Sequence, residues 1–222
     1  MSEVLTAVKS LLLVLTGLFP IVNPLGGSPI FLLLTREYSP ETRRQLSRRI
    51  AINSFFLLIG SYLVGTHVLA FFGISLPVVQ VGGGLVVVST GWTMLKQGEH
   101  EEGGRVERGE QKDPLRSAFY PLTMPLTVGP GSISVAITLG ANAAHLHRSN
   151  PVATIAAVVG CLLLGASVFL CYGFADRLAR ILGATAMSVI MRLSSFLLVC
   201  IGVQIVWNGV SALLATVPLE IR

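Results

Sequence analysis

Two short segments of the sequence combine prolines, glycines and polar side chains in a way that suits the binding of a small polar molecule. One lies around Asn23–Pro29 and the other around Thr123–Ser132. Proline inside a helix removes a backbone donor and clashes with the preceding turn, at a cost of ~3 kcal/mol or more. A helix interrupted there leaves N–H and C=O groups free, and the N-terminus of the following half-helix attracts an anion. We therefore expect a binding site formed by Asn23, Pro24, Gly26, Gly27, Ser28, Thr123, Pro125, Thr127, Gly129, Pro130, Gly131 and Ser132.

The polar side chains of these segments also have local roles that compete with ligand binding. Asn23 directly precedes Pro24, and an asparagine in that position caps the helix that begins after the break. Capping alone, and capping combined with ligand contact, both remain open for Asn23. Serine and threonine in helices often bond to carbonyls of the preceding turn. We expect such local bonds for the hydroxyls of Ser28, Thr127, Ser132 and Ser134, whereas Thr123, between Pro121 and Pro125, is the better candidate for ligand contact because the nearby backbone is already freed.

The composition places both segments in a membrane protein. Hydrophobic residues make up 52% of the 222 positions and charged residues 12%, whereas an ordinary globular domain carries about 25% charged residues. The charges are also bunched, and five long runs hold no Asp, Glu, Lys or Arg: 10–35, 50–95, 117–147, 149–175 and 193–219. A soluble fold needs charge across its surface, so we predict an integral membrane protein in contact with the lipid bilayer.

The uncharged runs are continuous, which favours helices over the alternating strands of an outer-membrane barrel. About 20 apolar residues cross the hydrocarbon core, so the run 50–95 is long enough for two crossings joined by a turn at Gly73–Pro77. The predicted fold is an all-α integral membrane protein with six transmembrane helices, near residues 7–35, 50–72, 77–95, 116–141, 151–174 and 188–214.

The basic residues follow the loops of this topology rather than forming a nucleic-acid surface. Twelve of the sixteen Lys and Arg residues fall after the first, third and fifth predicted spans, against three on the opposite side. Cytoplasmic loops carry the excess of basic residues. Both termini are therefore predicted to be periplasmic and the loop 96–115 cytoplasmic.

The two proline-rich segments also indicate an internal repeat. At an offset of 101 residues, three prolines and the pair Leu25 and Leu126 coincide. Each segment begins a three-helix half, and because three is odd the halves must be inverted relative to each other. We predict a single transmembrane domain over 1–222, with halves 1–95 and 116–222 joined by the polar linker 96–115. Broken helices at matching positions of inverted repeats point to the binding site of a transporter at the membrane midplane.

Two polar residues of the last predicted span are further candidates. Arg192 is the one Lys or Arg well inside a span, and charge within a membrane is a functional candidate by default. It lies near the predicted helix end, so its side chain can also extend to the headgroups, and we expect this or a structural ion pair. Gln204 and Asn208 are one turn apart and are expected to bond between helices. Asp176 is expected to begin a cytoplasmic loop.

Several other function classes lack the residues that they need. Cys161, Cys171 and Cys200 form no CxxC pair, so no metal site or redox motif is indicated. A membrane thiol redox shuttle needs a cysteine in each broken helix, and none is present in 7–35 or 116–141. No acidic residue lies deep in a span, and no serine–histidine or paired-aspartate arrangement indicates an enzyme. We predict no catalytic residue, metal or cofactor, and the oligomeric state stays open.

The proline-rich segments resemble the two signature segments of the MarC family of bacterial inner-membrane proteins. The residues concerned are Asn23–Pro29 and Met124–Gly131, and the segments Gly73–Pro77 with Gly82–Gly84 and Arg192–Gly209 are similar to that family as well. The resemblance implies a six-helix inverted repeat of the LysE-like superfamily. Members of the SnatA type transport small neutral amino acids. Met124 stands where the pseudo-symmetric partner of Asn23 would be, so the two half-sites are chemically unequal.

Together these observations favour a secondary transporter of glycine, alanine or serine in the bacterial inner membrane, with ion or proton coupling left open. The carboxylate is expected to face the N–H groups around Gly26–Ser28 or Gly129–Ser132, and the ammonium the carbonyls freed by the prolines. Asn23 and Thr123 are expected to add side-chain oxygens for the ammonium. The alternative is a membrane exporter of another small solute.

Overall fold

The structure is a computed structural model that describes residues 2–97, 116–146 and 151–216. Every regular element in these ranges is a helix. The first half contains α1 (Ser2–Val22), α2 (Pro24–Leu34), α3 (Pro40–Phe71) and α4 (Leu76–Gln97). The second half contains a short 3₁₀ turn η1 (Arg116–Ala118), the π-helical segment η2 (Phe119–Thr127), α5 (Pro130–Leu146), α6 (Pro151–Gly173) and α7 (Ala175–Leu214). The predicted all-α class is confirmed.

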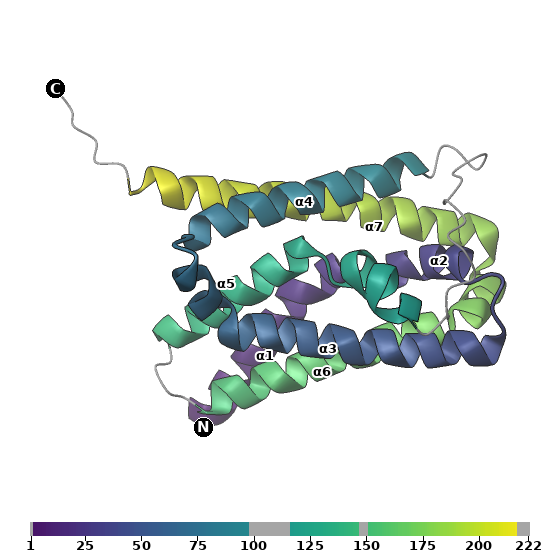
Figure 1. The fold of residues 1–222 in the computed structure, drawn as a ribbon, viewed down its shortest axis with the longest axis horizontal. Helices are drawn as coiled ribbons and strands as arrows, with labels where there is room; N and C mark the ends of the chain where they lie inside the picture. The colour runs from purple at the N-terminus through teal and green to yellow at the C-terminus, as the bar shows by residue number, and fades with distance from the viewer. Residues whose placement is uncertain (1, 98–115, 147–150, 217–222) are drawn as a thin grey trace.

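The helices lie in three layers (Figure 1). The pair α4 and α7 forms one outer layer, and the pair α3 and α6 forms the other. The two interrupted paths, α1 with α2 and η2 with α5, lie between them and contact both. The proline-rich segments are therefore enclosed by protein on two sides, where an interrupted backbone is tolerated in a membrane.

Five helical stretches of the described chain are long and apolar enough to cross a membrane. They are Glu3–Leu34, Pro40–Phe71, Leu76–Lys96, Pro151–Gly173 and Thr185–Leu214, and the bent pair η2 and α5 makes a sixth crossing if it is counted as one span. Their outward faces carry large apolar side chains, including Leu33, Phe56 and Trp207, each at least 60% exposed. Such a surface requires lipid rather than water around it.

Two predicted span starts differ from the structure, and helix also extends into charged segments outside the hydrocarbon core. The second predicted span begins ten residues early, at Pro40, where the Ser39 hydroxyl accepts a hydrogen bond from the Thr42 N–H at 3.2 Å. The last predicted span, from residue 188, agrees within three residues with the crossing Thr185–Leu214, but a further helical segment precedes it from Ala175, with a kink at Gly183, which has φ 74°. Asp176 therefore lies in the first turn of α7, not in a loop, and bonds to Arg43 of α3 at 2.7 Å. The start of the fourth span, predicted as helix from 116, is irregular through Thr127.

The outer pair α4 and α7 packs through glycines. A Cβ built on Gly84 would lie 2.8 Å from the backbone nitrogen of Val206, and one built on Gly202 would lie 2.7 Å from that of Val88. No side chain fits at such distances, so these glycines let the two backbones touch. Close approach through small residues is a common way to join helices in a membrane.

Candidate functional site

The first break is a single residue. Asn23 adopts the left-handed conformation, with φ 46° and ψ 57°, between the end of α1 at Val22 and the start of α2 at Pro24. Asparagine is one of the few residues with a side chain that adopts this conformation readily. Its Oδ1 accepts a hydrogen bond from the Gly26 N–H at 3.1 Å, so the predicted capping role is confirmed. Gly26, Gly27 and Ser28 are helical, so the break is narrower than the proline-rich segment Asn23–Pro29 in which it was expected.

The second break is wider and sharper. The π-helical segment η2 has non-helical angles at Tyr120 and Met124 and ends before an extended residue, Val128. The chain then turns at Gly129 into α5, with a bend of 62° between the two helices. The first bond of α5 runs from the Ile133 N–H to the Gly129 carbonyl at 3.1 Å. The N–H groups of Gly131 and Ser132 precede that bond, and the glycine before Pro130 has no side chain to cap them.

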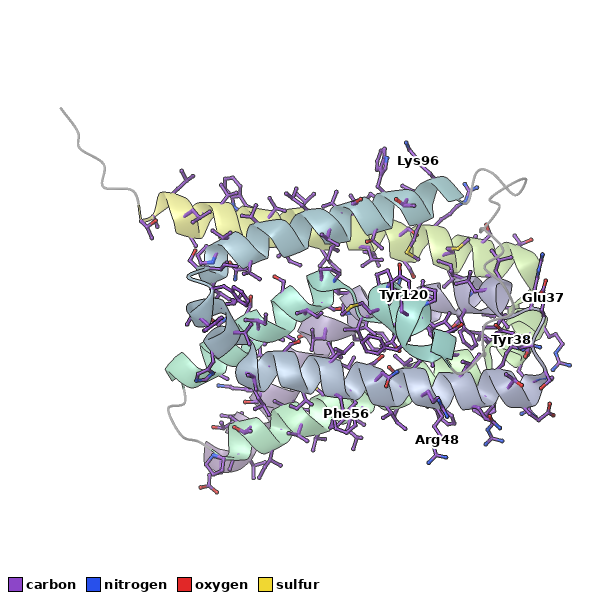
Figure 2. The ribbon with its side chains drawn as sticks, in the orientation of Figure 1. Glu37, Tyr38, Arg48, Phe56, Lys96 and Tyr120 are labelled. Atoms are coloured by element: carbon purple, nitrogen blue, oxygen red, sulfur yellow. The ribbon has the colours of Figure 1, made fainter. Side chains whose placement is uncertain are left out.

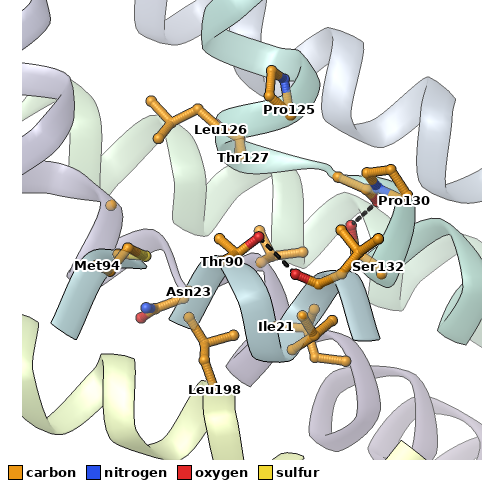
Figure 3. Close-up of a pocket in the computed structure, with 16 residues that line it drawn as sticks. Ile21, Asn23, Thr90, Met94, Pro125, Leu126, Thr127, Pro130, Ser132 and Leu198 are labelled. Carbon is orange, nitrogen blue, oxygen red and sulfur yellow. Dashed lines mark hydrogen bonds between the residues drawn. The ribbon is translucent and has the colours of Figure 1, made fainter. Parts of the chain in front are cut away.

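The two breaks meet at a cavity of about 70 Å³ (Figure 3). A cavity needs about 10–15 Å³ of such space to hold one water molecule, so this one has room for a compact ligand. Eight of the twelve predicted binding residues line the cavity: Asn23, Gly27, Pro125, Thr127, Gly129, Pro130, Gly131 and Ser132. Pro24, Gly26, Ser28 and Thr123 do not line it.

The amide of Asn23 is oriented opposite to the sequence-based expectation. Its oxygen already accepts from Gly26, whereas its Nδ2 is buried and has no partner among the described residues. Gly26 is needed for this placement, because a Cβ at that position would collide with the Asn23 amide. A buried donor without a partner costs about 1–3 kcal/mol. The polar atom of Asn23 without a partner is therefore a donor, Nδ2, and not the oxygen that was expected to contact an ammonium group.

The serine hydroxyls bond to backbone carbonyls, locally at Ser28 and Ser132 as predicted, but on another helix at Ser134. Ser28 donates to the Pro24 carbonyl at 2.7 Å, and Ser132 donates to the Gly129 carbonyl at 2.9 Å. Ser134, on the next turn of α5, donates to the Val79 carbonyl of α4 at 2.9 Å and does not line the cavity. These three hydroxyl protons hold the backbone of the breaks and the neighbouring helix in place.

Thr123 and Thr127 fix the irregular segment η2. Their hydroxyls donate to the carbonyls of Ala118 and Leu122, at 2.6 and 2.7 Å respectively. Thr123 also lies 3.4 Å from the Asn53 amide of α3, and its side chain is fully buried away from the cavity. The contact that we predicted between Thr123 and a ligand is therefore not seen in this arrangement.

Comparison with known proteins identifies the family. The sequence model of the MarC family, described as MarC family integral membrane protein, matches residues 8–214. The chain belongs to the MarC family. It is 32% identical to the inner membrane protein MarC of Salmonella arizonae over 94% of this chain and 97% of the relative. It is 33% identical to MarC of Salmonella typhimurium over the same shares, and 29% identical to a membrane protein of Archaeoglobus fulgidus over 92% and 93%. No solved structure gives a significant match.

The cavity of this MarC-family chain has a wall that the sequence did not reveal. It is apolar apart from Thr90, and its residues come from α1, α4, η2 and α7: Ile21, Val22, Val86, Val87, Thr90, Met94, Leu126 and Leu198. Figure 3 places Thr90, Met94 and Leu198 beside Asn23. Periodicity alone marks such residues as part of a membrane helix, and nothing in their types distinguishes this inner face from a lipid-facing one.

A buried tyrosine of α6 also connects the two breaks of the MarC fold. The hydroxyl of Tyr172 lies 3.1 Å from that of Thr127 in the second break, and its ring stacks on Phe31 of α2 with centroids 4.7 Å apart. A Cβ on Gly27, in the first break, would lie 2.5 Å from the Tyr172 hydroxyl. Gly27 is thus required for close contact with Tyr172. The side chain of Tyr172 fixes the positions of the two breaks relative to each other.

The two other candidates of the MarC chain lie away from the cavity. Gln204 donates to Asn208 of the same helix at 2.9 Å on an exposed face of α7, so the predicted bond between helices was wrong. Arg192 is exposed on α7 and does not line the cavity. It lies about two turns into the crossing Thr185–Leu214, beyond the kink at Gly183. Among the described residues no cluster of three His, Cys, Asp or Glu side chains is placed to hold a metal ion.

Proposed function

We propose that this membrane protein is a secondary transporter that moves small neutral amino acids, such as glycine, alanine and serine, by alternating access. The observation that carries the proposal is the cavity at which a helix C-terminus, a helix N-terminus and an unpartnered amide meet. In this proposal the protein performs no covalent chemistry and needs no cofactor.

The carbonyl groups at the end of α1 would receive the ammonium group. Pro24 has no N–H, and the Gly26 N–H bonds to the Asn23 side chain. No described group donates to the carbonyls of Ile21 and Val22, and both residues line the cavity. The C-terminal end of a helix carries partial negative charge. A cation of the size of an ammonium group is the natural partner for these two oxygens.

The start of α5 would receive the carboxylate. The N–H groups of Gly131 and Ser132 precede the first intrahelical bond, and both residues line the cavity. The N-terminal end of a helix carries partial positive charge and binds anions. The Nδ2 of Asn23, which has no partner, would supply a further donor. A zwitterion would thus match the two helix ends of opposite polarity.

Size and charge of the cavity support a small neutral side chain. Its volume is about 70 Å³, and its lining contains no Asp, Glu, Lys or Arg. An extra charge on the ligand would stay uncompensated in this environment, which is costly inside a membrane. Lysine and arginine are therefore disfavoured as substrates.

The packing pattern supports the two inverted halves on which alternating access would rest. α1 packs on α6 as α5 packs on α3, and α4 packs on α7. The close contacts between α4 and α7 join three residue pairs: Pro77 to Gly209, Gly84 to Gly202, and Gly91 to Ser195. Each α4 residue of these pairs has its equivalent 118 positions later in α7, so exchanging the two helices gives the same three contacts. An antiparallel contact that maps onto itself in this way is expected of two helices related by a two-fold axis. The single domain over 1–222 with halves 1–95 and 116–222 remains part of the proposal.

The proposed location is the bacterial inner membrane with both termini in the periplasm. The names of the Salmonella relatives place those proteins in the inner membrane. The orientation rests on the distribution of basic residues, several of which belong to the segment 98–115 outside the described residues.

Counterflow in proteoliposomes tests the function. Vesicles loaded with unlabelled alanine and holding the purified full chain should accumulate labelled glycine or alanine, whereas vesicles loaded with lysine should not. Repeating the assay with and without a pH gradient would show whether protons are coupled. If no small neutral amino acid moves, while another small solute does, the alternative of a different exporter replaces this proposal.

A further inference from the structure

The membrane-facing side of the protein has a second hollow, far larger than the first. It is an apolar groove of about 380 Å³ between α3 and α6, with Arg48 at one end. The bottom of the groove forms where small residues let the two helices approach, since a Cβ on Gly165 would lie 3.1 Å from the Ala51 carbonyl. Phe55 and Phe56 form one wall, with their rings in edge contact at 5.2 Å.

The position of α3 relative to the bilayer places Arg48 at the level of the lipid headgroups. The helix has 32 residues and rises about 48 Å, whereas the hydrocarbon core is about 30 Å thick. Its charged residues lie before Ile50, and none follows up to Phe71. The uncharged part crosses the core, so the groove begins at the headgroups and extends one to two turns into the acyl region.

The charge at the mouth of the groove is positive and uncompensated. Arg48 forms no ion pair with any residue that the structure describes. Arg44, one turn earlier, is exposed as well, and α6 has no charged residue from Pro151 to Gly173. Figure 2 shows Arg48 and Phe56 projecting from the same side of α3. Guanidinium groups bind phosphate in a bidentate manner.

We propose that this groove is a binding site for an anionic phospholipid, with one acyl chain in the groove and the phosphate on Arg48. The bilayer supplies the ligand, and the site combines the two parts that such a lipid requires, an apolar channel and a cation at its headgroup end. The site lies on the outer side of α3 and α6, away from the cavity between the breaks, so it is independent of the proposed transport function.

Native mass spectrometry of the full chain tests the proposal. The protein is reconstituted in nanodiscs that contain equal amounts of phosphatidylcholine and phosphatidylglycerol with the same acyl chains. After release from the nanodisc, each protein molecule should retain one phosphatidylglycerol. Arg48→Gln should lower that retention by about tenfold or more, as for loss of a hydrogen bond to a charged group. Ala166→Leu should also lower it, because this exposed groove residue has room for a side chain that fills the channel.

The matched control is Arg177→Gln, which removes an exposed arginine from the start of α7 and should leave retention unchanged. Equal retention of the two lipids would overturn the proposal. So would equal losses from Arg48→Gln and Arg177→Gln, since they would indicate diffuse attraction to the membrane surface. Retention that depends on Arg48 but not on Ala166→Leu would contradict the acyl groove.

Discussion

Replacing Asn23 by aspartate separates the two functions that the structure assigns to its side chain. Asn23→Asp keeps an oxygen for the Gly26 N–H, which the native Oδ1 accepts at 3.1 Å. It replaces the unpartnered Nδ2 by a second oxygen. Aspartate adopts the left-handed conformation almost as readily as asparagine, and a negative charge at a helix N-terminus is favourable. The variant should therefore keep the capped break, while its carboxylate in an otherwise uncharged cavity lowers the free energy of unfolding.

The loss in binding follows from the hydrogen bond that Nδ2 would donate to the substrate carboxylate. A hydrogen bond to a charged group contributes about 1.5–3 kcal/mol. With about 1.4 kcal/mol per tenfold change, the dissociation constant for alanine should rise by about tenfold to a hundredfold. Repulsion between the two carboxylates adds to this loss at a pH where the introduced aspartate is ionised.

Equilibrium binding of labelled alanine to purified protein measures the change, and thermal unfolding checks the fold. The matched control is Ser134→Ala, which removes a hydroxyl bonded to Val79 outside the cavity and should bind alanine nearly as the native chain does. Native affinity in a folded Asn23→Asp protein would refute the assignment of Nδ2. An equal loss in Ser134→Ala would show that binding responds to general disturbance of α5.

Three other predictions concern packing, charge and orientation. Gly202→Ala should lower the thermal stability because its Cβ would lie 2.7 Å from a backbone nitrogen of α4. Gly82→Ala has open space around it and should be neutral or stabilising by up to ~1 kcal/mol. Similar losses of stability for both variants would contradict the close contact between α4 and α7. Arg192→Lys should retain nearly native transport in counterflow because Arg192 is exposed and away from the cavity, and a folded but inactive variant would show a specific role. Single cysteines at Ser2 and Gln97, in a cysteine-free background, should react with impermeant reagents from the periplasm and the cytoplasm respectively; the reverse pattern would invert the topology.

The sequence was sufficient to predict the helical class and the places where helices break. Proline lacks an N–H wherever it occurs, so the clustered prolines indicate an interruption in each segment, although the helices continue through Pro20 and Pro29. The capping role of Asn23 followed from its position before Pro24. The length of each break was harder to predict. Gly26 and Gly27 are helical in the first segment, whereas the second segment is irregular from Phe119. Local sequence does not determine how far neighbouring helices support a disrupted backbone.

The remaining parts of the site depend on contacts between distant residues. The direction of the Asn23 amide is set by the Gly26 N–H and by the absence of a Cβ at Gly26, which a helix-cap rule does not specify. Thr90 and Met94 reach the cavity only through the packing of α4 against the breaks. In the sequence, Tyr172 is an aromatic residue in an apolar run without a distinguishing feature. Its role follows only from its contacts with Thr127 and Gly27 in the folded chain.

The amide of Gly131 provides the most direct test that the two breaks form a binding site for a small neutral amino acid. The pair Pro130-Gly131 is the one Pro-Gly sequence in the chain. Labelling proline carbonyls with ¹³C and glycine nitrogens with ¹⁵N therefore isolates this N–H in a carbonyl-filtered NMR spectrum. We predict a saturable shift of its signal on addition of alanine or glycine, as the carboxylate accepts a hydrogen bond, and none with lysine. No shift with alanine, or an equal shift with lysine, would contradict the proposed site.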